Sequence, residues 1–247
     1  MLRKQALAPN LMTVVNLLLG FLAIVSAANG DFVKSGWLII VAAVCDVLDG
    51  KIARALHITS DFGVEFDSLA DVVSFGVAPA FLIYSAQLHD LRLFGVLVCF
   101  LPLAAGAVRL ARFNTTTTLL DKHHFIGMPI PAGAGLISSY VIFSHQLWES
   151  VQFPGLTIVL LLIGSTLMVS TIEFDALPRI SFRRGRQNTV KLVLLALALT
   201  ILAVSPSKTL FPLALGYILM QVGRAVLNSL RQDEDEEALP DISISKR

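Results

Sequence analysis

Four aspartates are the residues in this sequence best placed to do chemistry. They form two pairs, spaced three and four residues apart, beside or within apolar runs: Asp46 and Asp49, then Asp67 and Asp71. In helices, the members of each pair share one face. A carboxylate at the centre of a membrane costs about 2.5–3.5 kcal/mol, and four that meet also repel one another. Bound cations would offset this cost, and ligand sets made only of oxygen select hard ions such as Mg²⁺ or Mn²⁺.

Two such ions would form a clamp for phosphoryl chemistry, in which metals about 3.5–4 Å apart stabilise the attacking and leaving oxygens. Alternatively, the aspartates pair with Lys51 and Arg54, although two cations neutralise only half of four anions. Small residues flank the pairs, namely Gly50, Ala53 and Gly63. Such residues let a ligand approach closely, but they also pack helices tightly in membranes. Together with the carboxylates and Arg54, they favour a nucleotide pocket.

Long apolar segments must position these residues. The chain of 247 residues is 55% hydrophobic and 15% charged, against about 25% charged residues in a soluble domain. Nearly uncharged runs reach about 17 residues or more, the length that spans a bilayer as a helix. We expect eight spans, near residues 11–29, 35–56, 71–88, 91–111, 129–147, 154–172, 189–205 and 209–230. The composition therefore predicts an all-α, polytopic membrane helical bundle.

The predicted domain organisation is simple. Residues 1–231 form a single integral membrane catalytic domain, because the connections between spans are short. Residues 232–247 form an acidic tail without apolar periodicity, which predicts disorder. Arg3 and Lys4 before an apolar run imitate a signal peptide. Polar residues interrupt that run, so we expect it to be the first span.

The basic residues predict the orientation of the bundle. Lys and Arg gather before the first span and after the even-numbered spans, which places both termini and the aspartates in the cytosol. Residues 59–61 (Thr-Ser-Asp) are helix N-cap types, so a turn near 57–61 would start the third helix. That hairpin would bring both aspartate pairs to the cytosolic end. A bacterial-type plasma (inner) membrane is the default location.

The aspartate region resembles the signature of the CDP-alcohol phosphotransferases. The matching pattern is Asp46-x2-Asp49-Gly50-x2-Ala53-Arg54-x8-Gly63-x3-Asp67-x3-Asp71. The resemblance implies a six-helix core, to which this chain adds two helices. It also implies that the four aspartates bind two divalent metal ions, Mg²⁺ or Mn²⁺, and that Asp71 is the general base. The implied contacts to the CDP moiety are Asp46, Asp49, Gly50, Ala53, Arg54, Gly63 and Asp67.

Two further stretches are similar to the phosphatidylserine synthase branch of that family. The first carries Pro9, Asn10, Thr13, Asn16 and Gly20, and the second carries Arg112, Phe113 and Asn114, then Gly127, Pro129, Pro131 and Ala132. The resemblance covers most of residues 9–136. It implies transfer of the phosphatidyl group from CDP-diacylglycerol to L-serine, giving phosphatidylserine and CMP, with the lipid tails in the membrane.

Arg109 and Arg112 are candidate contacts for a lipid phosphate or the serine carboxylate, and Asn114 follows them. The two arginines are three residues apart, so they share a helix face, and guanidinium groups form forked hydrogen bonds to either anion. Anchoring of the helix by positive charge on the cytosolic side explains them equally well. Pro129 and Pro131 favour a helix start.

Other functions remain open from sequence. The same chemistry serves other acceptors or lipids: glycerol 3-phosphate, an inositol phosphate, or serine on an archaeal ether lipid. An ion transporter would also use intramembrane aspartates, but there is no second copy of the motif, as paired inverted halves would require. The net charge of +1 indicates no nucleic-acid partner. We expect a homodimer. The pattern does not decide between direct attack by serine and a covalent intermediate.

Overall fold

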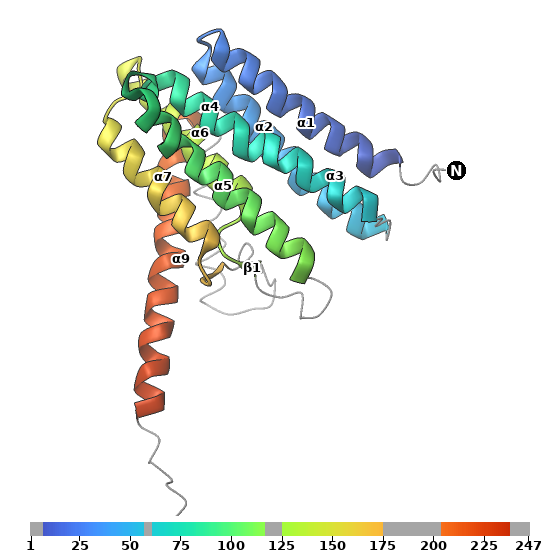
Figure 1. The fold of residues 1–247 in the computed structure, drawn as a ribbon, viewed down its shortest axis with the longest axis vertical. Helices are drawn as coiled ribbons and strands as arrows, with labels where there is room; N and C mark the ends of the chain where they lie inside the picture. The colour runs from blue at the N-terminus through green and yellow to red at the C-terminus, as the bar shows by residue number, and fades with distance from the viewer. Residues whose placement is uncertain (1–6, 57–60, 117–124, 175–203, 238–247) are drawn as a thin grey trace, which may run out of the picture.

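The structure, a computed structural model, describes residues 7–56, 61–116, 125–174 and 204–237. These residues form a bundle of helices, with α9 extending away from the others (Figure 1). The main helices are α1 (Leu7–Ala28), α2 (Phe32–Leu56), α3 (Asp61–Asp71), α5 (Arg92–Thr116), α6 (Ile130–Trp148), α7 (Pro154–Val169) and α9 (Pro206–Glu237). The predicted spans that fall within the described residues are mainly helical. The span predicted at 189–205 lies almost wholly outside them.

The helix that carries Asp67 and Asp71 is not a uniform α-helix. After α3 the chain continues through a π-helical segment, η2 (Val72–Val77), and then through α4 (Ala78–Ile83), π-helical η3 (Tyr84–Leu88) and a short 3-10 turn, η4 (His89–Leu91). Arg92 adopts a positive φ of 50°, and α5 then returns antiparallel to the α3–η3 segment (Figure 1). A π-helical turn widens the helix locally and often occurs at functional sites. Here η2 begins directly after Asp71.

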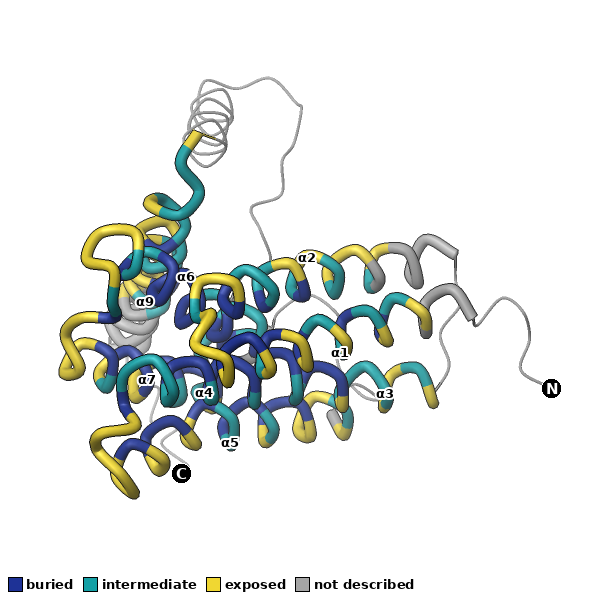
Figure 2. Tube along the Cα trace, turned by 90° about the horizontal axis from the view of Figure 1, so that it is seen from above, coloured by how far each residue is buried: buried dark blue, intermediate teal, exposed yellow. Residues whose placement is uncertain are grey.

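Helix α1 holds the aspartate-bearing helices together, because it packs against α2, α3 and η2. Small buried residues on the facing sides of α1 and α2, Ala23, Ala27 and Ala42, allow the helix axes to approach closely. Buried residues face the inside of the bundle, and exposed residues line its outer sides (Figure 2). The core therefore lies between helices, with the aspartates at one end of it.

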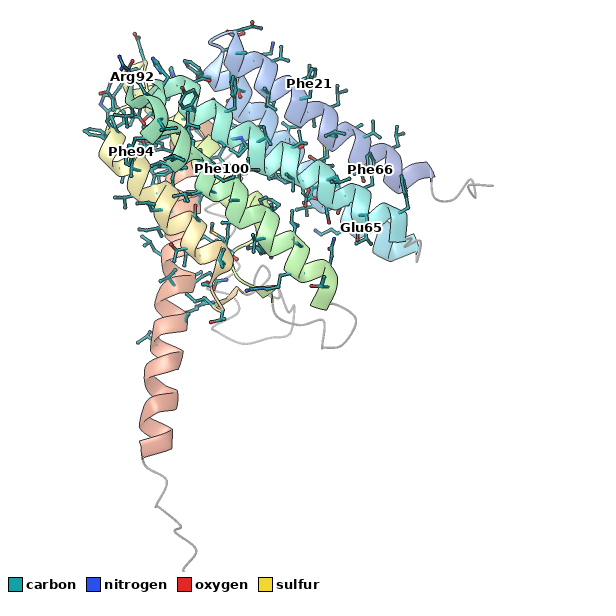
Figure 3. The ribbon with its side chains drawn as sticks, in the orientation of Figure 1. Phe21, Glu65, Phe66, Arg92, Phe94 and Phe100 are labelled. Carbon is teal, nitrogen blue, oxygen red and sulfur yellow. The ribbon has the colours of Figure 1, made fainter. Side chains whose placement is uncertain are left out.

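Large apolar side chains cover much of the outer surface. Phe21 on α1 is 58% exposed, and Phe94 and Phe100 on α5 are similarly exposed (Figure 3). Soluble monomers rarely expose apolar patches of this extent. Such a surface is typical of helices that contact lipid.

The predicted count of eight spans is not confirmed. Among the described residues, two helical stretches are long and apolar enough to cross a membrane, Leu11–Ala28 and Phe62–Thr115. The second contains both antiparallel legs of the α3–α5 hairpin. Helix α7 is apolar but shorter than a span. Helix α6 is 19 residues long but is not one of the two apolar stretches. Polar residues such as Ser138, Ser139 and His145 lower its mean hydropathy.

Two features depart from the predicted helical pattern. Strand β1 (Phe125–Ile126) pairs antiparallel with β2 (Glu173–Phe174), and this is the one strand pair in the described part of the chain. Helix α9 continues to Glu237, although the tail from residue 232 was expected to be disordered. Glutamate is a good helix former, so the helix continues into the acidic run. Residues 238–247 lie outside the described residues.

Gly127, next to strand β1, provides a test of the connection into α6. Its φ is +79°, and a Cβ at this position would lie 2.4 Å from the carbonyl oxygen of Met168. We expect Gly127→Ala to lower the free energy of unfolding by about 1–3 kcal/mol, measured by thermal unfolding in detergent. Gly135→Ala is the control, because a Cβ there meets no described heavy atom within 4 Å. Equal unfolding temperatures for the two variants would contradict the close contact.

Candidate metal centre

Three of the four predicted aspartates come together in space. Asp46 lies on α2, while Asp67 and Asp71 lie on α3. One carboxylate oxygen from each is within 4.8 Å of the other two. Asp71 is buried, and the other two side chains are partly buried. The i, i+4 spacing places Asp67 and Asp71 on one helix face, as predicted, and α1 packs against both α2 and α3.

The geometry of this aspartate cluster fits a divalent cation. Bonds from Mg²⁺ to oxygen are about 2.1 Å, so ligand oxygens on opposite sides of the ion lie about 4.2 Å apart. The three oxygens lie within 4.8 Å of one another, so small side-chain movements would bring all three into contact with one ion. Oδ1 of Asp67 is buried and has no hydrogen-bond partner among the described residues. A buried carboxylate oxygen without a partner, beside two further carboxylates, is unfavourable unless a bound cation or a proton neutralises it, and three converging carboxylates suit a cation.

Arg109 is a buried basic residue whose charge interacts with the cluster in the described part of the chain. Its side chain is 7% exposed, and its charge interacts with those of Asp71 and Arg112. Its Nε atom is buried and has no hydrogen-bond partner in the described part of the chain. Arg109 therefore provides a buried positive charge whose electrostatic interaction reaches Asp71.

Arg112 and Asn114 have different surroundings, although the sequence grouped them with Arg109. Arg112 is exposed and donates a hydrogen bond of 3.4 Å to the carbonyl of Val169, the last residue of α7. Cations at a helix C-terminus are favourable. Asn114 donates a 3.1 Å hydrogen bond to Oγ of Ser68 on α3. Asn114 thus ties the end of α5 to α3, next to Asp67.

The remaining predicted site residues are placed only in part. Asp49, Ala53 and Arg54 lie on α2, but their side chains are outside the described part of the structure. Gly50 on α2 and Gly63 on α3 are both partly buried. Their roles in nucleotide binding stay predictions.

Asn16 joins the cluster without having been predicted as a site residue. Its Nδ2 donates a 3.3 Å hydrogen bond to Oδ1 of Asp71 from across the α1–α3 contact. Two signals were available in the sequence. Asn16 belongs to the stretch that is similar to the phosphatidylserine synthase branch, and polar residues within apolar segments are commonly functional.

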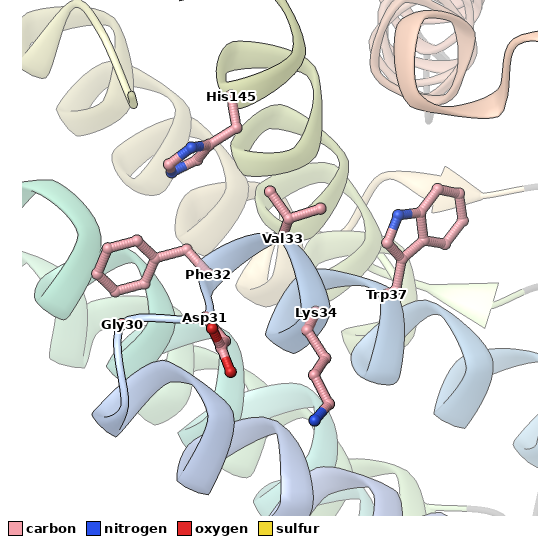
Figure 4. Close-up of a pocket in the computed structure, with 7 residues that line it drawn as sticks. All are labelled: Gly30, Asp31, Phe32, Val33, Lys34, Trp37 and His145. Atoms are coloured by element: carbon pink, nitrogen blue, oxygen red, sulfur yellow. The ribbon is translucent and has the colours of Figure 1, made fainter. Parts of the chain in front are cut away.

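A separate cavity of about 640 Å³ lies at the opposite end of α2 (Figure 4). It is bounded by the α1–α2 turn and the end of α6, where the His145 ring is 5.9 Å from that of Phe32. Its lining residues are Gly30, Asp31, Phe32, Val33, Lys34, Trp37 and His145. None of them belongs to the aspartate cluster, so this cavity is a distinct feature of the bundle.

Comparison with known proteins agrees with the motif. Residues 6–172 match the family model described as CDP-alcohol phosphatidyltransferase, a range that contains the whole aspartate cluster. The chain is 37% identical over 207 residues to a Helicobacter pylori protein named CDP-diacylglycerol–serine O-phosphatidyltransferase, covering 83% of this chain and 84% of the relative. A Methanocaldococcus jannaschii protein of the same name is 39% identical over 177 residues, covering 72% and 78%. An archaetidylserine synthase of Methanothermobacter thermautotrophicus is 37% identical over 171 residues, covering 67% and 68%.

Proposed function

The chain belongs to the CDP-alcohol phosphatidyltransferase family, and we propose that it transfers the phosphatidyl group of CDP-diacylglycerol to L-serine, giving phosphatidylserine and CMP. The names of the relatives support this donor and acceptor. The observation that carries the chemistry is the convergence of Asp46, Asp67 and Asp71 within 4.8 Å. It supports a metal-assisted transfer over a structural role for these carboxylates.

The proposed metal ligands are the four aspartates of the motif. Asp46, Asp67 and Asp71 would bind Mg²⁺ or Mn²⁺ through the oxygens that already converge, and Asp49 would complete a site for two ions. When bound, such ions stabilise negative charge on the phosphoryl and leaving-group oxygens. The cytidine diphosphate would lie along Gly50, Ala53, Arg54 and Gly63, whose small residues permit close approach.

Asp71 is the proposed general base. The serine hydroxyl oxygen forms a bond to the phosphorus that bears the lipid, the bond from that phosphorus to the CMP oxygen breaks, and the hydroxyl proton moves to Asp71. Asp71 is buried, and its Oδ1 accepts a hydrogen bond from Asn16, so its orientation is restricted before serine arrives. Holding reactants in a fixed geometry supplies much of the acceleration in such reactions.

Arg109 is the strongest candidate for anion binding among the three residues after the motif. It is buried and lies close enough to Asp71 for their charges to interact, so its guanidinium would reach a donor phosphate or the serine carboxylate. Arg112 would first have to leave the Val169 carbonyl. Asn114 would act from its position beside Ser68.

The family is membrane-associated, and the exposed apolar side chains of this chain agree with that setting. We further propose a homodimer in the plasma (inner) membrane with the aspartate cluster at the cytosolic face. The placement of basic residues supports this orientation. The lipid tails of the donor would remain in the bilayer while its head group enters the bundle.

An acceptor panel tests the proposed function. Purified enzyme in detergent, with Mg²⁺ or Mn²⁺, is incubated with CDP-diacylglycerol and labelled L-serine, glycerol 3-phosphate or an inositol phosphate. We expect CMP release and labelled phospholipid with serine alone. Labelled product from a phosphorylated acceptor but not from serine would overturn the assignment.

The donor lipid and the transporter alternative need separate assays. Because one relative is an archaetidylserine synthase, the panel includes the ether-linked analogue of the donor. Faster turnover of the ether lipid would assign that substrate instead. Cation flux into liposomes without CMP release would indicate a transporter.

A further inference from the structure

Asn16 occupies an unusual position for a polar residue. It lies in the apolar run of α1, and its side chain is 0% exposed. Its Nδ2 donates a 3.3 Å hydrogen bond to Oδ1 of Asp71, a residue 55 positions away in sequence. Burying an amide is costly unless its groups are hydrogen-bonded. The bond to Asp71 is therefore the interaction that compensates Nδ2 at this position.

Contacts between α1 and η2 hold the backbone of Asn16 close to Asp71. Oγ of Ser74, in η2, donates a 2.9 Å hydrogen bond to the backbone carbonyl of Asn16. One turn further along α1, a Cβ at Gly20 would lie 2.4 Å from Oγ of Ser74. The absence of a side chain at Gly20 thus lets α1 approach η2 closely enough for the Asn16 amide to reach the carboxylate.

The side-chain oxygen of Asn16 shows that packing alone does not explain why an asparagine lies at this position. Oδ1 of Asn16 is buried and has no hydrogen-bond partner among the described residues. Turning the amide over would place that oxygen against the carboxylate oxygen of Asp71, which is unfavourable because both atoms are acceptors. A leucine of similar size would fill the same space without an unpaired oxygen. The amide N–H is the feature that a leucine lacks.

We infer that Asn16 is a positioning residue, whose amide holds one carboxylate oxygen of Asp71 so that the other is directed at the bound metal and the acceptor hydroxyl. This inference rests on the proposed function, since it gives Asp71 its role. Residues that hydrogen-bond to metal ligands fix ligand orientation, and their loss typically costs about 10- to 100-fold in metal affinity or activity. Asn16 would act in this way from the first helix, outside the aspartate motif.

The test compares Asn16→Leu with a control that loses a different buried hydrogen bond. Thr157 is buried and donates to the side chain of Gln87, at the opposite end of the α3–η3 segment from the aspartates. We expect Asn16→Leu to reduce kcat for CMP release by about 10- to 100-fold and to weaken Mn²⁺ binding by a similar factor. KM for serine should change much less than kcat. Thr157→Val should leave kcat and Mn²⁺ affinity unchanged.

Thermal unfolding of each variant separates positioning from packing. If kcat falls only in proportion to the folded fraction, or equally in Thr157→Val, Asn16 has a structural role and the inference is overturned. Should Asn16→Leu not fold, Asn16→Ala removes the same amide without adding apolar volume. If wild-type enzyme releases no CMP from CDP-diacylglycerol and serine, the proposed function fails. Mn²⁺ binding, read by electron paramagnetic resonance, then decides on Asn16, and an unchanged affinity overturns its role.

Discussion

Replacing Asp71 with asparagine is expected to reduce CMP release by about 100- to 10,000-fold, the range that a general base contributes. The amide cannot accept the proton of the serine hydroxyl. It also provides a weaker metal ligand beside Asp46 and Asp67. Because Asn and Asp have the same shape, the variant should remain folded in detergent, with an unfolding temperature close to that of wild type. Steady-state CMP release at saturating serine measures the effect.

Asp90→Asn is the matched control for this substitution. Asp90 is exposed in η4, at the far end of the α3–η3 segment, with one carboxylate oxygen 3.3 Å from Nε2 of the neighbouring His89. The change in charge is identical, but no effect on turnover is expected. If Asp71→Asn keeps a sizeable share of wild-type turnover, Asp71 is not the base. If both variants lose activity together, the cause is a general change in charge.

The aspartate cluster was predictable because its determinants are local. A spacing of four residues places Asp67 and Asp71 on one helix face whatever the rest of the fold does. Asp46 lies ten residues before the end of α2, and Asp71 lies ten residues after the start of α3, so the two are at similar distances from the connection between these consecutive helices. The family pattern then supplied roles that spacing by itself does not give.

Contacts between distant helices could not be predicted in the same way. The bond from Asn16 to Asp71 depends on how closely α1 crosses η2, and that depends on Gly20 meeting Ser74. Periodicity within α1 shows only that Asn16 is a polar residue in an apolar run. The π-helical segment Val72–Val77, which begins after Asp71, was likewise not predicted from the sequence.

The two arginines show that residues on the same helix face can still have different environments. Arg109 and Arg112 are three residues apart on α5, which predicted a common environment. The structure buries Arg109 near Asp71 and leaves Arg112 exposed at the end of α7. The hydrogen bond from Arg112 to Val169 depends on the position of α7, and nothing in the local sequence of α5 records that position.

Substituting Asp67 with asparagine should separate metal binding from folding. We expect it to maintain or raise the unfolding temperature of the metal-free protein and to lower that of the metal-bound protein. Without metal, the wild-type carboxylate is crowded by Asp46 and Asp71, and its buried Oδ1 has no partner among the described residues. A neutral amide relieves that repulsion. In EDTA, we therefore expect Asp67→Asn to unfold at the same temperature as wild type or higher.

With metal the order reverses. A ligand that binds only the folded state stabilises it by about 2.7 kcal/mol when its concentration is 100 times Kd. Wild type should gain stabilisation of this order on adding Mn²⁺, whereas Asp67→Asn, with a weakened site, should gain far less.

Thermal unfolding with EDTA and with Mn²⁺ measures both effects without any substrate. Glu65→Gln, an exposed position on the same helix (Figure 3), controls for the loss of one negative charge. If Asp67→Asn and Glu65→Gln gain equally from Mn²⁺, the ion is not held by Asp67. Because this measurement does not depend on the acceptor, it tests the metal centre even if serine proves to be the wrong substrate.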